Sequence, residues 1–74
     1  MKPKPYSAIH KYVGWWVITT DGKDRALGQI VQTEDIVSVV RFADGDDRIA
    51  NSALLDPRIT QLFPSQRAAT EARR

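Results

Sequence analysis

The stretch Ile36-Val37-Ser38-Val39-Val40-Arg41-Phe42-Ala43-Asp44-Gly45 decides the fold of this 74-residue chain. Its first seven residues are mostly β-branched or aromatic, and such side chains favour an extended strand. The Asp-Gly pair that follows stands between two apolar runs, which is the strongest short-range signal for a hairpin. We therefore predict a strand over 36–42, a turn within 43–47 and a further strand over 48–51.

Three more strands are predicted on either side of this hairpin. Strand-forming residues dominate 12–20, 25–32 and 59–63, and polar or glycine-containing turns separate these stretches. Residues 52–55 are predicted to form one helical turn, which ends at Asp56-Pro57 because the residue before proline avoids helical dihedral angles. Five short strands in so small a chain predict an all-β fold that closes into a barrel and so removes its edges.

Several short motifs resemble the SH3-like small barrels of the Tudor and KOW type. They are Asp21-Gly22, Gly28-Gln29-Ile30-Val31, the stretch from Val40 to Gly45, and Leu54-Leu55 before the last strand. The resemblance covers about residues 13–63 and implies a five-stranded SH3-like small barrel. We accordingly expect a flexible basic N-terminal segment over 1–11, the barrel over 12–64, and a polar basic C-terminal tail over 65–74.

Charge is distributed unevenly along the chain, whose formal net charge is +2. Residues 12–66 carry five basic and eight acidic residues, so the expected barrel is acidic. The ends carry one acidic residue and six basic ones, which are Lys2, Lys4, Lys11, Arg67, Arg73 and Arg74. The ends of such a barrel emerge close together, so these six residues could pool and bind nucleic acid through its phosphates. Solubility is the other explanation for them.

Two adjacent tryptophans, Trp15 and Trp16, lie in the first predicted strand. Neighbours in a strand face opposite sides, so one indole is expected in the core and the other on the surface. Alternation does not choose between them; we favour Trp16 inward beside Ile18, with Trp15 exposed. Aromatic rings near carboxylates can hold a cationic side chain. The expected partner site comprises Tyr12, Trp15, Trp16, Asp44, Asp46 and Asp47, with the three aspartates at the hairpin tip.

Alternation along the strands also sorts the apolar positions into two sets. The inward set is Ile30, Ile36, Ser38, Val40 and Phe42. The outward set, Leu27, Val31, Val37 and Val39, is called the outer apolar set below. Such a set predicts a surface that another copy or another protein covers, or else strongly coiled strands that bury both sides of the sheet. So small a domain without disulfides also gains stability by oligomerising.

No cofactor, metal or catalytic residue is expected. The chain has no cysteine and one histidine, His10, so it lacks the ligands of a structural zinc site. The three hairpin aspartates lack the distal glutamate of an EF-hand. The N-terminus has no apolar segment, and no apolar run is long enough to span a bilayer. We predict a cytoplasmic, non-enzymatic interaction module that self-associates and binds a protein or cationic partner.

One enzyme alternative follows from a second, local resemblance. Gly28-Gln29-Ile30-Val31 is similar to a stretch of the type II plasmid dihydrofolate reductases, which build an active pore from several small barrels. The resemblance implies a pore segment near Arg48-Ile49-Ala50-Asn51. That segment lacks the glutamine and tyrosine of the family's Val-Gln-Ile-Tyr-Pro motif. A pore-type reductase therefore ranks third, after an interaction module and nucleic-acid binding through the tails.

Overall fold

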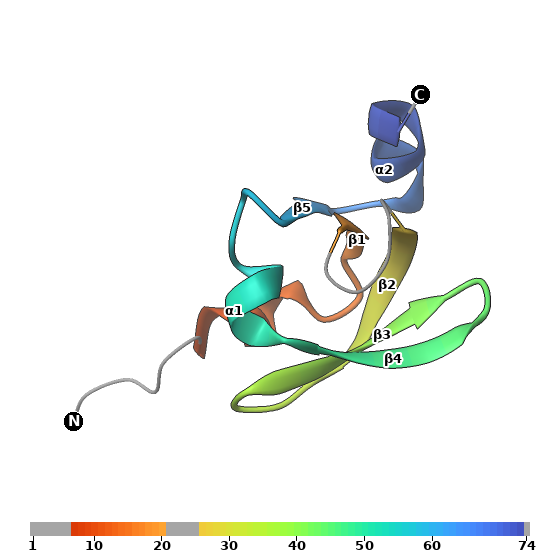
Figure 1. The fold of residues 1–74 in the computed structure, drawn as a ribbon. Helices are drawn as coiled ribbons and strands as arrows, with labels where there is room; N and C mark the ends of the chain where they lie inside the picture. The colour runs from red at the N-terminus through yellow and green to blue at the C-terminus, as the bar shows by residue number, and fades with distance from the viewer. Residues whose placement is uncertain (1–6, 21–25, 74) are drawn as a thin grey trace.

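The computed structural model describes residues 7–20 and 26–73 (Figure 1). In this part of the chain five strands form one antiparallel sheet, in the order β4-β3-β2-β1-β5. The strands are β1 (Trp16–Thr19), β2 (Ala26–Thr33), β3 (Val37–Phe42), β4 (Gly45–Ala50) and β5 (Thr60–Phe63). The helices are the 3-10 helix η1 (Ser7–Tyr12), α1 (Asn51–Leu54) and α2 (Gln66–Arg73). The prediction of a largely β chain is confirmed.

The sheet does not close into the predicted barrel. β4 and β5 are its two edges, and each pairs with a single neighbour, β4 with β3 and β5 with β1. The helix α1 starts directly after β4 and contacts both β4 and β5. Its Leu54 side chain is fully buried and covers this end of the core. The prediction of a closed barrel is wrong because a helical turn, rather than a strand pair, fills the gap between the edges.

The hairpin predicted from the Asp-Gly pair joins β3 to β4, but its turn is shorter than expected. Only Ala43 and Asp44 lie between Phe42 and Gly45, and Phe42 faces Gly45 across the hairpin. Gly45 has a φ of 129°, in the region that favours glycine. Asp46 and Asp47 therefore lie in β4 and not at the hairpin tip, where the sequence analysis placed them.

The main core lies on one side of the sheet. Its buried members are Ile9, Val17, Ile30, Val40, Phe42, Ile49, Ala53 and Leu54. Gly28 faces the same side, since a Cβ atom there would lie 2.6 Å from Cγ1 of Val40 and 2.8 Å from the Phe42 ring. The predicted inward set is confirmed except at Ile36, which is 73% exposed. Ile36 precedes β3, where the strand alternation has not begun.

A buried polar cluster attaches α1 to the sheet. The Ser38 hydroxyl donates to Oδ1 of Asn51 over 2.5 Å, and both residues are fully buried. The Asn51 side chain donates in turn to the carbonyl of Glu34 over 2.7 Å, and its backbone N–H donates to the carbonyl of Ile36 over 2.7 Å. Every polar group of the Asn51 side chain is thus satisfied, so the amide fixes the start of α1 against the turn before β3.

Both predicted flexible ends contain regular structure. In the N-terminal segment, residues 1–6 lie outside the described part, and 7–11 belong to η1, whose Ile9 is fully buried in the core. At the other end, residues 66–73 form α2, which packs on β1 and β5 through the fully buried Ala69. The Ser65 hydroxyl accepts a hydrogen bond from Ala68 N–H over 3.1 Å, and so caps the helix. These residues were predicted to be flexible ends, and in the structure they form helices that pack on the sheet.

The strand β1 is buried on both sides. Val17 belongs to the main core, whereas Ile18 is 4% exposed but lies outside that core cluster. Ile18 faces the opposite side of the sheet, here called the outer side, where α2 packs on β1 and β5. Figure 1 shows α1 and α2 on opposite sides of β5. A helix that the sequence analysis did not expect therefore explains why β1 shows no exposed apolar side.

Candidate functional site

Both tryptophans are half-buried. Val17 faces the main core, so its strand neighbour Trp16 lies on the outer side with Ile18, whereas Trp15 precedes β1. The prediction that Trp16 points inward is therefore wrong. Neither indole is exposed, since both residues are half-buried.

Trp15 belongs to an aromatic cluster at the turn between η1 and β1. Its ring meets the Tyr12 ring edge to face, with centroids 4.8 Å apart and planes at 82°. The backbone N–H of Trp15 donates to the Tyr12 carbonyl over 2.9 Å. Gly14, with a φ of 88°, permits this tight turn. The ammonium of Lys11 lies 5.3 Å from the centroid of the Tyr12 ring, within cation–π range.

Trp16 lies on the outer side between two cross-strand neighbours. It faces Phe63 on β5 and Gln29 on β2, and the Gln29 side chain donates to the carbonyl of Gly14 over 3.0 Å. Phe63 is not among the predicted site residues. The length and apolar content of the final predicted strand could, however, have indicated that it pairs with the first strand. Trp16 and Phe63 are therefore cross-strand neighbours on the outer side.

The aspartates of the expected partner site are separated from these rings. Asp46 and Asp47 lie on β4, and the two strands β2 and β3 separate β4 from the tryptophans on β1. Asp46 is also bound by Arg41, whose Nε donates to its Oδ1 over 3.0 Å. This hydrogen bond and the charge of Asp46 raise the pKa of Arg41. The structure does not bring the aromatic rings and the carboxylates together into one cage.

The basic residues assigned to nucleic acid are only partly described. Lys2, Lys4 and Arg74 lie outside the described residues, and Arg73 is the last residue of α2. Arg67 forms an ion pair with Glu71 over 3.3 Å on the exposed surface of α2. Figure 1 shows η1, which carries Lys11, well apart from α2. The described basic residues therefore do not form one patch.

The outer apolar set lies where it was predicted, on β2 and β3. All four of its side chains, Leu27, Val31, Val37 and Val39, are half-buried. The pairing of β2 with β3 shifts between Ile30 and Gln32, so Val31 is the extra residue of a β-bulge. Val39 faces Arg48 on β4 and borders a hollow of about 360 Å³ that Asp46, Asp47 and Arg48 also line. This part of the outer side combines apolar and charged groups.

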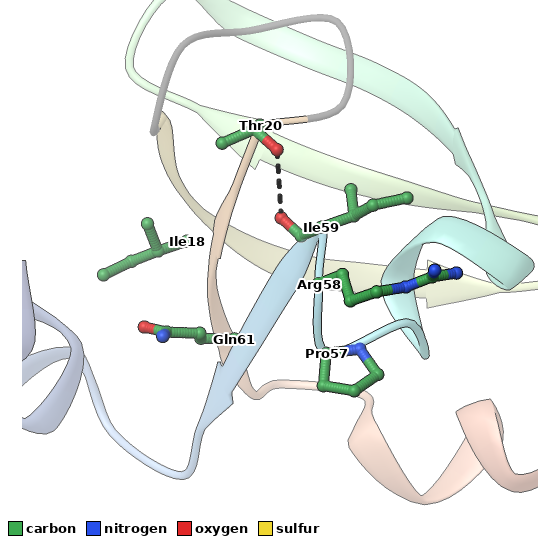
Figure 2. A pocket seen from close by; sticks show the side chains of 6 residues that line it. All are labelled: Ile18, Thr20, Pro57, Arg58, Ile59 and Gln61. Atoms are coloured by element: carbon green, nitrogen blue, oxygen red, sulfur yellow. Dashed lines mark hydrogen bonds between the residues drawn. The ribbon is translucent and has the colours of Figure 1, made fainter.

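A smaller pocket opens between β1 and the start of β5 (Figure 2). It measures about 120 Å³ and is lined by Ile18, Thr20, Pro57, Arg58, Ile59 and Gln61. The Thr20 hydroxyl donates to the Ile59 carbonyl over 3.3 Å. In Figure 2 the Arg58 side chain extends away from Gln61, so the polar groups of the pocket do not converge on one point. This arrangement offers no anion site.

Arg58 instead stabilises the turn before β5. Its Nε and Nη2 donate to the two carboxylate oxygens of Asp56 over 3.2 and 3.0 Å, and its backbone N–H donates to Oδ1 over 2.9 Å. The side-chain hydrogen bonds from Arg58 are the main cause of the lowered pKa of Asp56. The Asp56 carbonyl also accepts hydrogen bonds from the N–H groups of Ile59 and Thr60.

Replacing Asp56 with asparagine should flatten the dependence of stability on pH. A carboxyl group whose pKa is lower in the folded chain stabilises the fold above its unfolded pKa, and this contribution disappears as the pH falls through the folded value. The native chain should therefore exceed D56N in stability at pH 7, and the difference should vanish in strong acid. Urea unfolding measured from pH 7 to pH 2 tests this, and R58Q should reproduce the flatter profile. A constant difference at every pH would contradict the expectation.

The described residues contain no group of three or more histidine, cysteine, aspartate or glutamate side chains that could hold a metal ion. The Nδ1 atom of His10 shares a 2.8 Å hydrogen bond with the Thr33 hydroxyl on the exposed surface. None of the described helices has the length and apolar character needed to cross a membrane. Comparisons with protein-family models, with curated proteins and with solved structures found no match for this chain.

Proposed function

We propose that this chain is a non-enzymatic interaction domain that self-associates and binds protein through the outer side of β2, β3 and β4. The observation that carries the proposal is the outer apolar set, whose four side chains are only half-buried, while α2 packs on β1 and β5. A run of apolar side chains on the solvated side of a sheet marks a contact surface. The neighbouring charged residues Arg41, Asp46 and Arg48 would form the polar rim that such interfaces have.

The proposal does not include a compact cage for a cationic side chain, because β2 and β3 separate Trp16 on β1 from Asp46 and Asp47 on β4. Trp16 and Asp46 both lie on the outer side of the sheet, with β2 and β3 between their strands. A protein partner that covers this side could therefore contact both residues. The partner is therefore expected to be a folded surface or a long segment rather than a single side chain.

Replacing Val39 with lysine should weaken self-association by tenfold or more, at a cost of about 1.4 kcal/mol, because a charge would replace an apolar contact at the centre of the surface. Sedimentation equilibrium from 10 to 500 µM, concentrations chosen to span weak dimers, measures the effect. V13K is the matched control, since Val13 is 51% exposed on the turn before β1. A native chain that stays monomeric throughout would overturn the proposal, as would equal losses in the two variants.

The same samples distinguish the second candidate function. Duplex DNA or RNA mixed with the native chain at low and moderate salt should leave the sedimentation profile unchanged, because residues 12–66 carry more acidic than basic groups. A complex that weakens steeply with salt would instead favour nucleic-acid binding by the basic ends.

A further inference from the structure

We propose that two copies of this chain associate by pairing their β4 strands, antiparallel and centred on Asp47. This inference rests on the self-association in the proposed function, and it places the contact at the free edge of β4, beside the outer apolar set. It starts from the open sheet, whose edge strands β4 and β5 each pair with a single neighbour. Edge strands present backbone groups that a further strand can bind.

β4 is the more available of the two edges. β5 has four residues and is followed directly by Pro64, which has no N–H to donate. The N–H of Thr60 on β5 is already bound by the Asp56 carbonyl over 2.9 Å. β4 has six residues, and Gly45, Asp46, Asp47 and Arg48 are all exposed. A strand can therefore pair along most of β4.

The hydrogen-bond register shows which backbone groups of β4 face outward. The N–H of Asn51 donates to the carbonyl of Ile36, next to the pair Val37 and Ala50. Antiparallel ladders alternate between residues that bond to the neighbour and residues that do not. Counting back from Asn51, residues 49, 47 and 45 bond to β3, so Asp46, Arg48 and Ala50 direct their backbone groups to the free edge. The N–H of Arg48 indeed donates to its neighbour's carboxylate, Oδ1 of Asp47, over 3.0 Å.

Charge complementarity selects a second copy as the partner. Asp46 and Arg48 lie on the outer side of β4, two residues apart. When two β4 strands pair around Asp47, Asp46 of each copy faces Arg48 of the other, and the outward backbone groups of these two residues lie at the interface. Opposite charges in such cross-strand positions stabilise pairing. The register overlaps residues 45–49 of both copies, so it uses nearly all of β4.

Asp47 limits the strength of this pairing. Its carboxylate already occupies the outward N–H of Arg48, and in the proposed register it faces Asp47 of the second copy. Like charges directly opposite each other destabilise a strand pair. The two Asp46–Arg48 pairs therefore favour the dimer and the Asp47 pair opposes it. The expected dimer is weak and reversible.

Cross-linking tests the register directly, because the native chain contains no cysteine. In the proposed dimer the two Asp47 residues form a non-hydrogen-bonded pair, whose Cα atoms lie about 4.5 Å apart, within the range that a disulfide spans. D47C should form a covalent dimer under mild oxidation. D46C is the matched control. In this register position 46 of one copy is offset by two residues from position 46 of the other, so their Cα atoms lie about 8 Å apart, which is too far for a disulfide. Equal cross-linking of the two variants, or none, would overturn the inference.

A charge exchange provides an independent test without cysteine. D46K places like charges across the interface in its own homodimer, and R48D does the same with the opposite sign. Each variant should therefore associate at least about tenfold more weakly than the native chain, while an equimolar mixture should dimerise again because positions 46 and 48 then carry opposite charges in both cross-strand pairs. Sedimentation of the separate and mixed samples measures this, with circular dichroism to verify folding. If the native chain dimerises and the mixture does not, the β4 inference fails and the proposed function stands.

Discussion

Replacing Asn51 with leucine should lower the free energy of unfolding by about 3 kcal/mol, because leucine matches the shape of asparagine but none of its hydrogen bonds. The Ser38 hydroxyl and the Glu34 carbonyl would both lose their partner, and the Ser38 side chain is fully buried. An unpaired buried polar group costs about 1–3 kcal/mol. For a domain of this size the melting temperature should fall by roughly 12–24 °C, which differential scanning calorimetry would show.

A double-mutant cycle separates this effect from a change in packing. S38A removes the hydroxyl that N51L would leave unpaired, so S38A/N51L should be more stable than the sum of the two single effects by about 1–2 kcal/mol. Strictly additive losses would show that the hydrogen bond between the two side chains contributes little. In that case the sensitivity of Asn51 would have to come from its place at the start of α1.

Replacing Gly28 with valine should destabilise the chain by about 3 kcal/mol, because any side chain at this position enters occupied space. Even a Cβ atom would approach Cγ1 of Val40 to 2.6 Å and the Phe42 ring to 2.8 Å. Val40 is fully buried and Phe42 is 6% exposed, so neither has open space to move into. A domain of this size has a total stability of only about 3–5 kcal/mol, and we expect much of G28V to be unfolded at 25 °C.

The matched control for G28V is Q32V, which makes the same gain in side-chain branching on the same strand. Gln32 is exposed, and valine favours extended structure, so Q32V should change the stability by less than about 0.5 kcal/mol. Urea unfolding of both variants, followed by tryptophan fluorescence, compares them. Equal losses would mean that β2 tolerates no branched residue at all, whereas a neutral G28V would show that the core adapts by moving Phe42.

The sequence predicts the centre of the sheet well, for identifiable reasons. The run from Val37 to Phe42 is long and β-branched enough that its strand and its inward residues are confirmed. The Asp-Gly signal places the hairpin correctly, but it does not determine whether two or five residues form the turn. Asp46 and Asp47 were therefore predicted in the turn, but they lie in β4. The expectation that they form an acidic hairpin tip is wrong.

The misplaced parts depend on contacts between distant segments. The cap at Ser65 and the small side chain of Ala69 allow α2 to pack on β1, but a short polar segment has no local signal strong enough to indicate this docking. The predicted orientation of Trp16 is wrong for the same reason. Because α2 packs on β1 and Ile18 is buried on the outer side, β1 lacks the expected difference between a buried and an exposed side. Closure of the barrel depended on where α1 would lie, which local patterns do not fix.

The position of β1 between β2 and β5 also determines the order in which the sheet can assemble. β2, β3 and β4 pair with their neighbours in sequence across short turns, so these contacts close small loops. The pairing of β1 with β5 joins residues such as Thr19 and Thr60, which are 41 positions apart, and their buried hydroxyls form a 2.9 Å hydrogen bond. Closing that loop costs more chain entropy before any contact compensates for it. We therefore expect the β2–β3–β4 hairpins to form first and the addition of β5 with α2 to be the last and slowest step.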